Sequence, residues 1–235
     1  MGTVDLLSHT TALSGVPRDR LEALARAAVQ QTYPRGAILW RAGDVPQNFV
    51  VVQRGLVKLV RHANRARAIC GLFGPTESLG DLSAIRGLPY PADAIAASES
   101  VSVVCLPRQL VMQVFADDPK LFMSLACAIE EKVEALLDKI DVLSAGSVEA
   151  RLATLLLKLN ARFGDDFDDG TSEIPVALSR RDLAELVATS FETAIRVMSR
   201  WEREGVLSTT RRGFTLRDVS KLATVSGTVT ALAAE

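Results

Sequence analysis

The chain has 235 residues, enough for one large domain or two small ones with buried cores. It has 48% hydrophobic residues, 23% charged residues and a net charge of -1, so the protein is not basic overall. Any affinity for nucleic acid must therefore come from a local cluster of arginines. No apolar run reaches the roughly 18 residues of a membrane span, and the N-terminus lacks the pattern of a secretory signal. We therefore expect a cytoplasmic protein with no membrane partner.

Residues 1–118 are predicted to form a small antiparallel roll or barrel. A short amphipathic helix begins at Pro17, and another helix is expected from Arg108 to Ala116. The expected strands lie at 37–41, 49–53, 56–60, 67–73, 92–97 and 101–106. Glycine, which adopts positive φ at little cost, recurs between them at Gly36, Gly43, Gly55, Gly71, Gly74 and Gly80. Many short strands joined by tight turns favour a roll over an open sheet.

The cysteines and the polar motifs argue against a disulfide framework and against an enzyme. Cys70, Cys105 and Cys127 are odd in number and far apart, so we expect buried thiols in a reducing compartment, with a redox or metal role as the alternative. No phosphate-binding loop, no metal-ligand cluster and no His/Asp/Ser constellation is present. The sequence therefore predicts neither catalytic residues nor a metal site.

Residues 119–145 are predicted to form one long helix that pairs with a second copy of itself. Pro119 follows two aspartates, a favourable helix start. Apolar residues then recur at alternating steps of four and three, at Ile129, Val133, Leu136, Ile140 and Leu143. Such a narrow seam is typical of a coiled coil and predicts a homodimer, although an ordinary core helix of a monomer is the alternative. The helix is expected to end at Ser144–Gly146, with Ser147 capping the next helix.

Residues 146–235 are predicted to form a compact, mostly helical domain. A helix at 148–163 is followed by an acidic loop at 164–170 and a short strand at 173–178. Helices at 180–188 and 191–204 then flank a tight turn at Thr189–Ser190. A β-hairpin of 206–209 with 214–217 completes the pattern. Two short helices, a turn and a hairpin indicate a winged helix-turn-helix, so the fold class is α+β.

Positive charge is concentrated in one segment of this last domain. Residues 179–217 contain eight arginines against five acidic residues, and the acidic loop outside this stretch conceals the excess in the net charge. Early in the second helix, Glu192 and Arg196 are the residue types that bond cytosine and guanine in the major groove. The alternative is a plain i,i+4 surface ion pair worth about 0.3 kcal/mol. The supersecondary pattern favours base recognition.

These motifs resemble the Crp/Fnr family of transcription regulators. The family's DNA-binding signature is similar to LSRRDLAELVATSFETAIRVMSRWEREG at 178–205. Its cyclic-nucleotide-binding roll resembles ILWRAGD at 38–44, VVVQRGLVKL at 50–59 and ESLGDL at 77–82. The resemblance covers about residues 15–220 and implies a roll sensor (1–118), a dimerisation helix (119–145) and a winged helix-turn-helix (146–235).

The resemblance also implies roles for residues of the helix-turn-helix. It assigns base recognition to Glu192 and Arg196. Phe191 stands at a further recognition position that is arginine or aliphatic in the family, and Ile195 stands where Fnr proteins have serine. We therefore expect a TGA-like half-site core, and the sequence leaves the outer bases open. Phosphate contacts are expected from the positions that the family uses and from nearby arginines, namely Ser179, Arg180, Arg181, Ser190, Arg200, Arg211 and Arg212. If the protein activates transcription, RNA polymerase is a further expected partner.

The effector pocket that the resemblance implies comprises Gly80, Asp81, Leu82, Ser83, Pro91, Ala92, Leu136 and Leu137. Cyclic AMP binders clamp the phosphate with an Arg–Ser pair, but this chain has Pro91–Ala92 there. Because a buried phosphate needs a cation or hydroxyl partner, we expect no useful cAMP binding. The adenine-contacting Thr–Ser pair is likewise replaced by two leucines.

The effector itself stays open at this stage. An Fnr-type iron–sulfur sensor needs an N-terminal cysteine cluster, which is absent. A haem is possible only with His9 or His62 as axial ligand, and His62 is expected at a solvated hairpin tip. A small organic effector is the other possibility. The alternatives in function are a DNA-binding protein that senses nothing and a pure cyclic-nucleotide-binding module.

Overall fold

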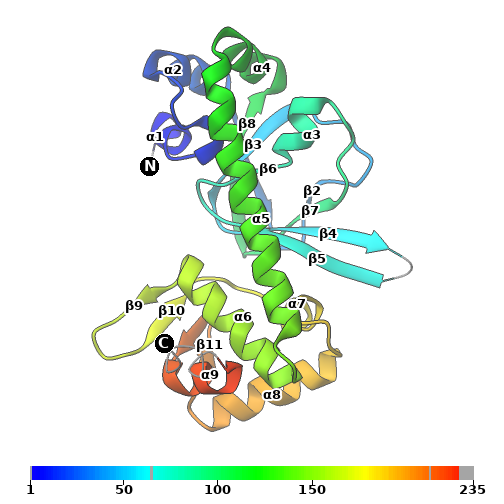
Figure 1. Ribbon diagram of the computed structural model, residues 1–235, viewed down its shortest axis with the longest axis vertical. Helices are drawn as coiled ribbons and strands as arrows, with labels where there is room; N and C mark the ends of the chain where they lie inside the picture. Colours follow the sequence, from blue (N-terminus) through cyan, green and yellow to red (C-terminus); the bar gives the residue numbers. More distant parts are fainter. Residues whose placement is uncertain (1, 64–65, 212, 228–235) are drawn as a thin grey trace. The chain divides into compact units, whose positions relative to one another are not determined.

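The computed structural model describes residues 2–63, 66–211 and 213–227 (Figure 1). The chain divides into two compact units, Met1–Glu134 and Ala135–Glu235, and the division falls within the long helix α5 (Phe122–Ser144). None of the described helices is long and apolar enough to cross a membrane.

The first unit is a roll of two antiparallel four-stranded sheets. One sheet has the order β1-β8-β3-β6, built from β1 (Val29–Pro34), β8 (Ser100–Pro107), β3 (Asn48–Arg54) and β6 (Ser78–Leu79). The other has the order β2-β7-β4-β5, built from β2 (Ile38–Trp40), β7 (Asp93–Ala96), β4 (Val57–Ala63) and β5 (Ala66–Phe73). The predicted antiparallel roll is therefore confirmed.

Helices cover one face of the first sheet. They are α1 (Thr3–Ser8), the 3₁₀ turn η1 (Thr11–Leu13), α2 (Arg18–Ala27), α3 (Asp81–Arg86), α4 (Arg108–Asp117), the 3₁₀ turn η2 (Pro119–Leu121) and the start of α5. Alternate residues of β3 point to opposite faces, as the strand period of two requires. Phe49 and Val51 pack with Leu125 of α5 among the helices, whereas Val50 and Val52 pack between the two sheets.

Several elements of the first unit were not predicted from the sequence. Strand β1 was missed because five of its six residues are exposed, so it lacks the apolar alternation of a half-buried strand. Helices α1 and α3, the turn η1 and the two-residue strand β6 are too short for a periodic signal. The helices predicted from Pro17 and from Arg108 to Ala116 are confirmed as α2 and α4.

The second unit contains the end of α5, a helical core and a small sheet. Its elements are α6 (Val148–Phe163), β9 (Asp165–Asp166), β10 (Ser172–Ile174), α7 (Arg180–Leu186), α8 (Phe191–Arg203), β11 (Leu207–Thr209), β12 (Phe214–Leu216) and α9 (Val219–Ser226). The strands form one sheet of order β11-β12-β10-β9. Ser147 caps α6 as predicted, accepting from the Ala150 N–H. The predicted helix-turn-helix and wing are confirmed.

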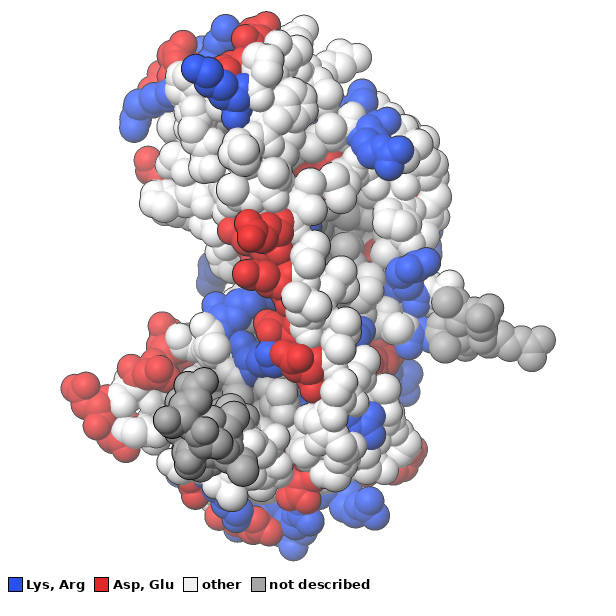
Figure 2. Space-filling view, in the orientation of Figure 1, with Lys and Arg blue, Asp and Glu red and all other residues white. Residues whose placement is uncertain are grey.

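Two predictions in this unit were wrong in detail. The acidic segment at 164–170 is a loop only in part, because Asp165–Asp166 form β9, which pairs with β10 as a hairpin on which acidic side chains gather (Figure 2). Strand β10 ends at Ile174 rather than 178, since the following Pro175 has no N–H to donate to a ladder. Helix α9 was not predicted.

Candidate nucleic-acid interface

The first helix of the pair, α7, begins with two reciprocal hydrogen bonds. Ser179 Oγ accepts from the Asp182 N–H at 3.1 Å, and Asp182 Oδ2 accepts from the Ser179 N–H at 3.1 Å. This capping box satisfies two of the N–H groups that every helix start leaves unpaired. Ser179 stays exposed, so the position predicted to contact phosphate also has a structural role.

The turn between α7 and α8 is unusual because Ala188 has a positive φ of 50°. A side chain in this left-handed region costs about 1 kcal/mol, which the surroundings must offset. Arg151 of α6 donates from Nη1 to the carbonyl of Val187 at 2.8 Å, and the Thr189 N–H donates to the Ala184 carbonyl at 2.9 Å. The turn is thus held from both sides, which fixes how α8 leaves α7.

Helix α8 has one buried and one exposed face. Ala194, Val197, Met198 and Trp201 are buried, and Trp201 Nε1 donates to Glu149 Oε1 of α6 at 3.2 Å. The four predicted base-reading residues, Phe191, Glu192, Ile195 and Arg196, are all exposed. Because positions i, i+1, i+4 and i+5 share a helix face, the fold brings these four side chains together at the start of α8.

The alternative of a plain surface ion pair is not what the structure contains. Within residues 2–63, 66–211 and 213–227, neither Glu192 nor Arg196 has an ion-pair or hydrogen-bond partner. An exposed arginine without an internal partner has its N–H donors available for an external acceptor, and an exposed glutamate has its oxygens available for an external donor. The face therefore presents an unpaired cation, an unpaired carboxylate and two apolar side chains.

The predicted phosphate contacts fall into two groups. Arg180 Nη2 lies 2.7 Å from Glu202 Oε1, and Arg200 pairs with Glu149, so these guanidinium groups already support the fold. Arg181 and Arg211 are exposed, and Arg181 lies over the Phe191 ring at 5.8 Å. Ser190, also exposed, caps α8 by accepting from the Thr193 N–H at 3.2 Å. Arg212 lies outside the described residues.

Comparison with known proteins identifies both halves of the chain. A model of the Crp-like helix-turn-helix domain matches residues 150–225, and a model of the cyclic nucleotide-binding domain matches residues 30–118. The CRP-like cAMP-activated global transcriptional regulator of Mycobacterium tuberculosis is 24% identical over 220 residues, which is 93% of this chain and 97% of that protein. The chain belongs to the Crp/Fnr family of transcription regulators. It is a DNA-binding regulator rather than an enzyme.

Two further comparisons agree with this assignment. The cyclic AMP receptor protein of Thermus thermophilus is 28% identical over 180 residues, covering 76% of this chain and 79% of that protein. The structure of FixK2 from Bradyrhizobium japonicum has the same fold, with a TM-score of 0.70 and 20% identity over 84% of this chain and 96% of that one.

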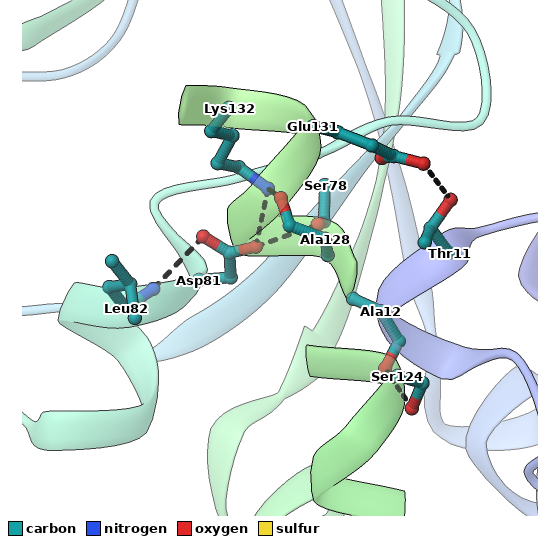
Figure 3. A network of polar contacts seen from close by, with 9 residues as sticks. All are labelled: Thr11, Ala12, Ser78, Asp81, Leu82, Ser124, Ala128, Glu131 and Lys132. Atoms are coloured by element: carbon teal, nitrogen blue, oxygen red, sulfur yellow. Dashed lines mark hydrogen bonds and ion pairs between the residues drawn. The ribbon is translucent and has the colours of Figure 1, made fainter. Parts of the chain in front are cut away.

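In this Crp/Fnr regulator, the acid of the predicted effector segment is already engaged by the protein. Asp81 is 4% exposed, and its Oδ2 accepts from Lys132 Nζ of α5 at 2.8 Å and from Ser78 Oγ at 2.9 Å (Figure 3). Its Oδ1 accepts from the Leu82 N–H at 3.0 Å. The carboxylate is thus satisfied by residues of the roll and of α5, without any ligand.

The space beside Gly80 is filled by two aromatic rings. A Cβ at Gly80 would lie 2.5 Å from Tyr90 and 3.2 Å from Trp40, and these two rings are stacked at a centroid distance of 4.1 Å. Trp40 Nε1 donates to the carbonyl of Ala92 at 3.1 Å, which ties the stack to the position where cAMP binders have their phosphate clamp.

The remaining residues of the predicted effector pocket differ in how exposed they are. Leu82 and Pro91 are exposed, Ser83 is half-buried and Ala92 is buried. Leu136 and Leu137 belong to the second unit, where both side chains are exposed. Their part in an effector pocket stays a prediction.

Both histidines are exposed and have partners within the protein. His62 lies in β4 with an exposed side chain and faces Asp93, with Nε2 3.3 Å from Oδ2. His9 follows α1, and its Nδ1 lies 2.7 Å from the Asp5 carbonyl oxygen. The expectation of buried thiols was wrong for Cys127, which is exposed on α5, whereas Cys105 is buried and Cys70 half-buried.

Lys132 is the site residue that sequence reasoning missed. It lies among charged residues on the flank of the apolar seam, a pattern that equally describes a solvated helix surface. Only the packing of α5 against the roll shows that its ammonium reaches a buried carboxylate.

Proposed function

We propose that this regulator binds palindromic DNA as a homodimer and reads each half-site with the start of α8. The observation that carries the proposal is the exposed, unpaired face formed by Phe191, Glu192, Ile195 and Arg196. Arg196 would bond a guanine edge and Glu192 a cytosine amino group, while Phe191 and Ile195 would make apolar contacts with neighbouring bases. The turn and caps described above hold this face rigidly, which favours specific over loose contacts.

Phosphate contacts are proposed for the residues that flank this face. Arg181 and Arg211 offer free guanidinium groups, and Ser179 and Ser190 lie at the two helix starts, where backbone N–H groups favour anions. Arg180 and Arg200 are proposed as well, because a guanidinium with five N–H donors can keep an internal carboxylate and still meet a phosphate. The proposal for Arg212 rests on sequence alone.

The homodimer is proposed to form through α5. Val133, Leu136, Ile140 and Leu143 are all exposed although they are apolar, and they follow the seam spacing along the helix. A contiguous exposed apolar stripe on a long helix is the pattern that a second helix covers.

Introducing a charge into the seam tests this part. Ile140 is 57% exposed, so Ile140→Glu removes no core contact and should leave the fold intact. We expect the variant to sediment as a monomer where the wild type sediments as a dimer, because a carboxylate cannot be buried between two apolar helices without a partner. Leu88→Glu, at an exposed apolar position of the roll, is the matched control and should stay dimeric. A dimeric Ile140→Glu protein would place the interface elsewhere.

We propose the division of labour that the sequence suggests: a sensor roll (1–118), a dimerisation helix (119–145) and a DNA-binding domain (146–235), working in the cytoplasm where its DNA lies. The effector is proposed to be something other than cAMP. The support is chemical: Pro91 and Ala92 offer a phosphate no cation or hydroxyl, and Asp81 is already paired with Lys132. RNA polymerase is proposed as a partner if the protein activates transcription.

In vitro selection from random duplex DNA, with and without cAMP, tests the function directly. We expect enrichment of inverted repeats whose half-sites lie about one helical turn, roughly 34 Å, apart. Addition of cAMP should leave the affinity for the selected sequence unchanged. Enrichment of single half-sites would overturn the homodimer, and a marked rise in affinity with cAMP would overturn the effector claim.

A further inference from the structure

A cavity of about 430 Å³ opens in the roll, away from the predicted effector-pocket residues and from the DNA interface. It is bounded by β1, β2, β3, β8 and the loop between β2 and β3, and its lining includes Tyr33, Trp40, Asp44, Val50, Tyr90, Val103 and Cys105. Its volume lies within the range of small-molecule sites, roughly 300–1,000 Å³. None of the predicted effector-pocket residues lines it.

We propose that this cavity binds a small aromatic amine. Val50, Val103 and the stacked rings of Trp40 and Tyr90 provide an apolar and aromatic wall, and the carboxylate of Asp44 lies at the exposed edge. A flat ring packs favourably against aromatic side chains, and an ammonium group is attracted both by a carboxylate and by the faces of the rings.

The charged groups of the lining determine whether a bound ligand should be a cation or an anion. Among the residues that the structure describes, no lysine, arginine or histidine lines the cavity. Burial raises the pKa of Tyr90 to about 12 and also raises the pKa values of Tyr33 and Cys105, so all three are neutral at physiological pH. Of the described lining residues, Asp44 is then the one that is charged, so the cavity attracts cations and repels phosphates and carboxylates.

The polar groups that would hold the ammonium are fixed in position. Asp44 Oδ2 accepts from the Arg41 N–H at 2.8 Å, while its other oxygen has no partner among the described residues. The Gly43 N–H donates to the Tyr90 carbonyl and the Tyr90 N–H to the Asp44 carbonyl, both at 2.9 Å. The loop and Tyr90 are thus tied together, and such preorganisation lowers the entropic cost of binding.

The cavity also has a physical route to α5. Its wall residue Tyr90 abuts Gly80, the residue that precedes α3, and the next residue, Asp81, pairs with Lys132 of α5. A ligand that shifts the Trp40–Tyr90 stack would therefore disturb the contact between α3 and α5. Regulation of DNA binding by this route rests on the proposed function, whereas binding of the amine does not.

Titration of the full-length protein with two matched probes tests the site. Phenethylamine and 3-phenylpropionate share a ring and a similar chain but differ in the sign of their charge. We expect millimolar phenethylamine to raise the melting temperature and to change tryptophan emission, and 3-phenylpropionate to do neither. Failure of phenethylamine to bind, or equal binding of both probes, would overturn the proposal.

Two variants assign the binding to Asp44. Asp44→Asn keeps an oxygen for the Arg41 N–H and removes the charge, and we expect it to weaken phenethylamine binding about tenfold, the equivalent of about 1.4 kcal/mol. Asp117→Asn, at an exposed acid that pairs with Arg20 outside the cavity, is the control and should bind as the wild type does. An unchanged affinity in Asp44→Asn would overturn the site.

The titrations contain no DNA, so they stand even if the selection experiment fails. Repeating the DNA titration with phenethylamine present then measures regulation alone. We expect the dissociation constant for the selected DNA to shift in the wild type and not in Asp44→Asn. An unchanged constant in the wild type would overturn the regulatory route and leave the binding site in place.

Discussion

Replacing Arg196 by alanine is expected to abolish most of the sequence specificity of DNA binding. A bidentate contact between arginine and guanine contributes about 1–3 kcal/mol, so a dimer on two half-sites should lose about 2–6 kcal/mol. The side chain is exposed and has no partner among the described residues, so the substitution breaks no internal contact. The loss should appear in titrations with the selected palindrome and be much smaller with unrelated DNA.

Arg203→Ala is the matched control for this experiment. Arg203 lies at the other end of α8 and is also exposed, where its Nε donates to the Ser199 carbonyl at 3.4 Å. Because Arg203 lies away from the proposed base-reading face, we expect its replacement to lower the affinity for both DNAs by a similar, smaller factor, without loss of sequence preference. If Arg196→Ala protects the same bases as the wild type in a footprint, Arg196 does not read the half-site.

Replacing Lys132 by methionine is expected to destabilise the protein by about 3 kcal/mol. Removal of one partner from a buried ion pair leaves an uncompensated charge, which costs more than the pair contributes. Here the remaining charge would be the carboxylate of Asp81, which is 4% exposed and would keep only Ser78 and the Leu82 N–H. Urea denaturation at neutral pH measures the difference in unfolding free energy.

Two further variants separate the buried charge from the loss of lysine itself. Lys120→Met removes an exposed lysine that precedes α5 and should change stability by less than about 0.5 kcal/mol. The double variant Asp81→Asn/Lys132→Met removes both charges and should recover much of the loss. If Lys132→Met and Lys120→Met are equally stable, the Lys132–Asp81 pair is not a stabilising contact between α3 and α5.

The helices of the second unit were the most predictable part of the fold. Helix α6 occupies the predicted residues, and α8 ends one residue before the predicted Glu204. Both have a strong apolar period and side chains that cap their starts, which are local signals. The edge strand β1 was unpredictable for the opposite reason: most of its residues are exposed and it is held by pairing with β8, a partner about 70 residues away in the chain.

The candidate site likewise has residues that the sequence predicted and contacts that only the structure shows. Glu192 and Arg196 were identified from helix spacing and from the resemblance, but whether they pair with each other depends on rotamers that the sequence does not specify. Arg180 and Arg200 have the same residue type as Arg181, yet both are tied to acids of the second unit. Which arginines form internal ion pairs was therefore decided by the packing of α8.

By itself, the sequence determined the antiparallel roll, the winged helix-turn-helix and the lack of a cation or hydroxyl side chain at Pro91–Ala92, because these depend on residue type and on spacing of a few residues. Only the tertiary structure decided that Asp81 is neutralised by Lys132, that Trp40 and Tyr90 stack beside Gly80, and that a cavity opens next to them. The Asp81–Lys132 and Trp40–Tyr90 contacts each join residues about 50 positions apart. Their geometry is set by how the sheets and α5 pack, and no local pattern of residues encodes it.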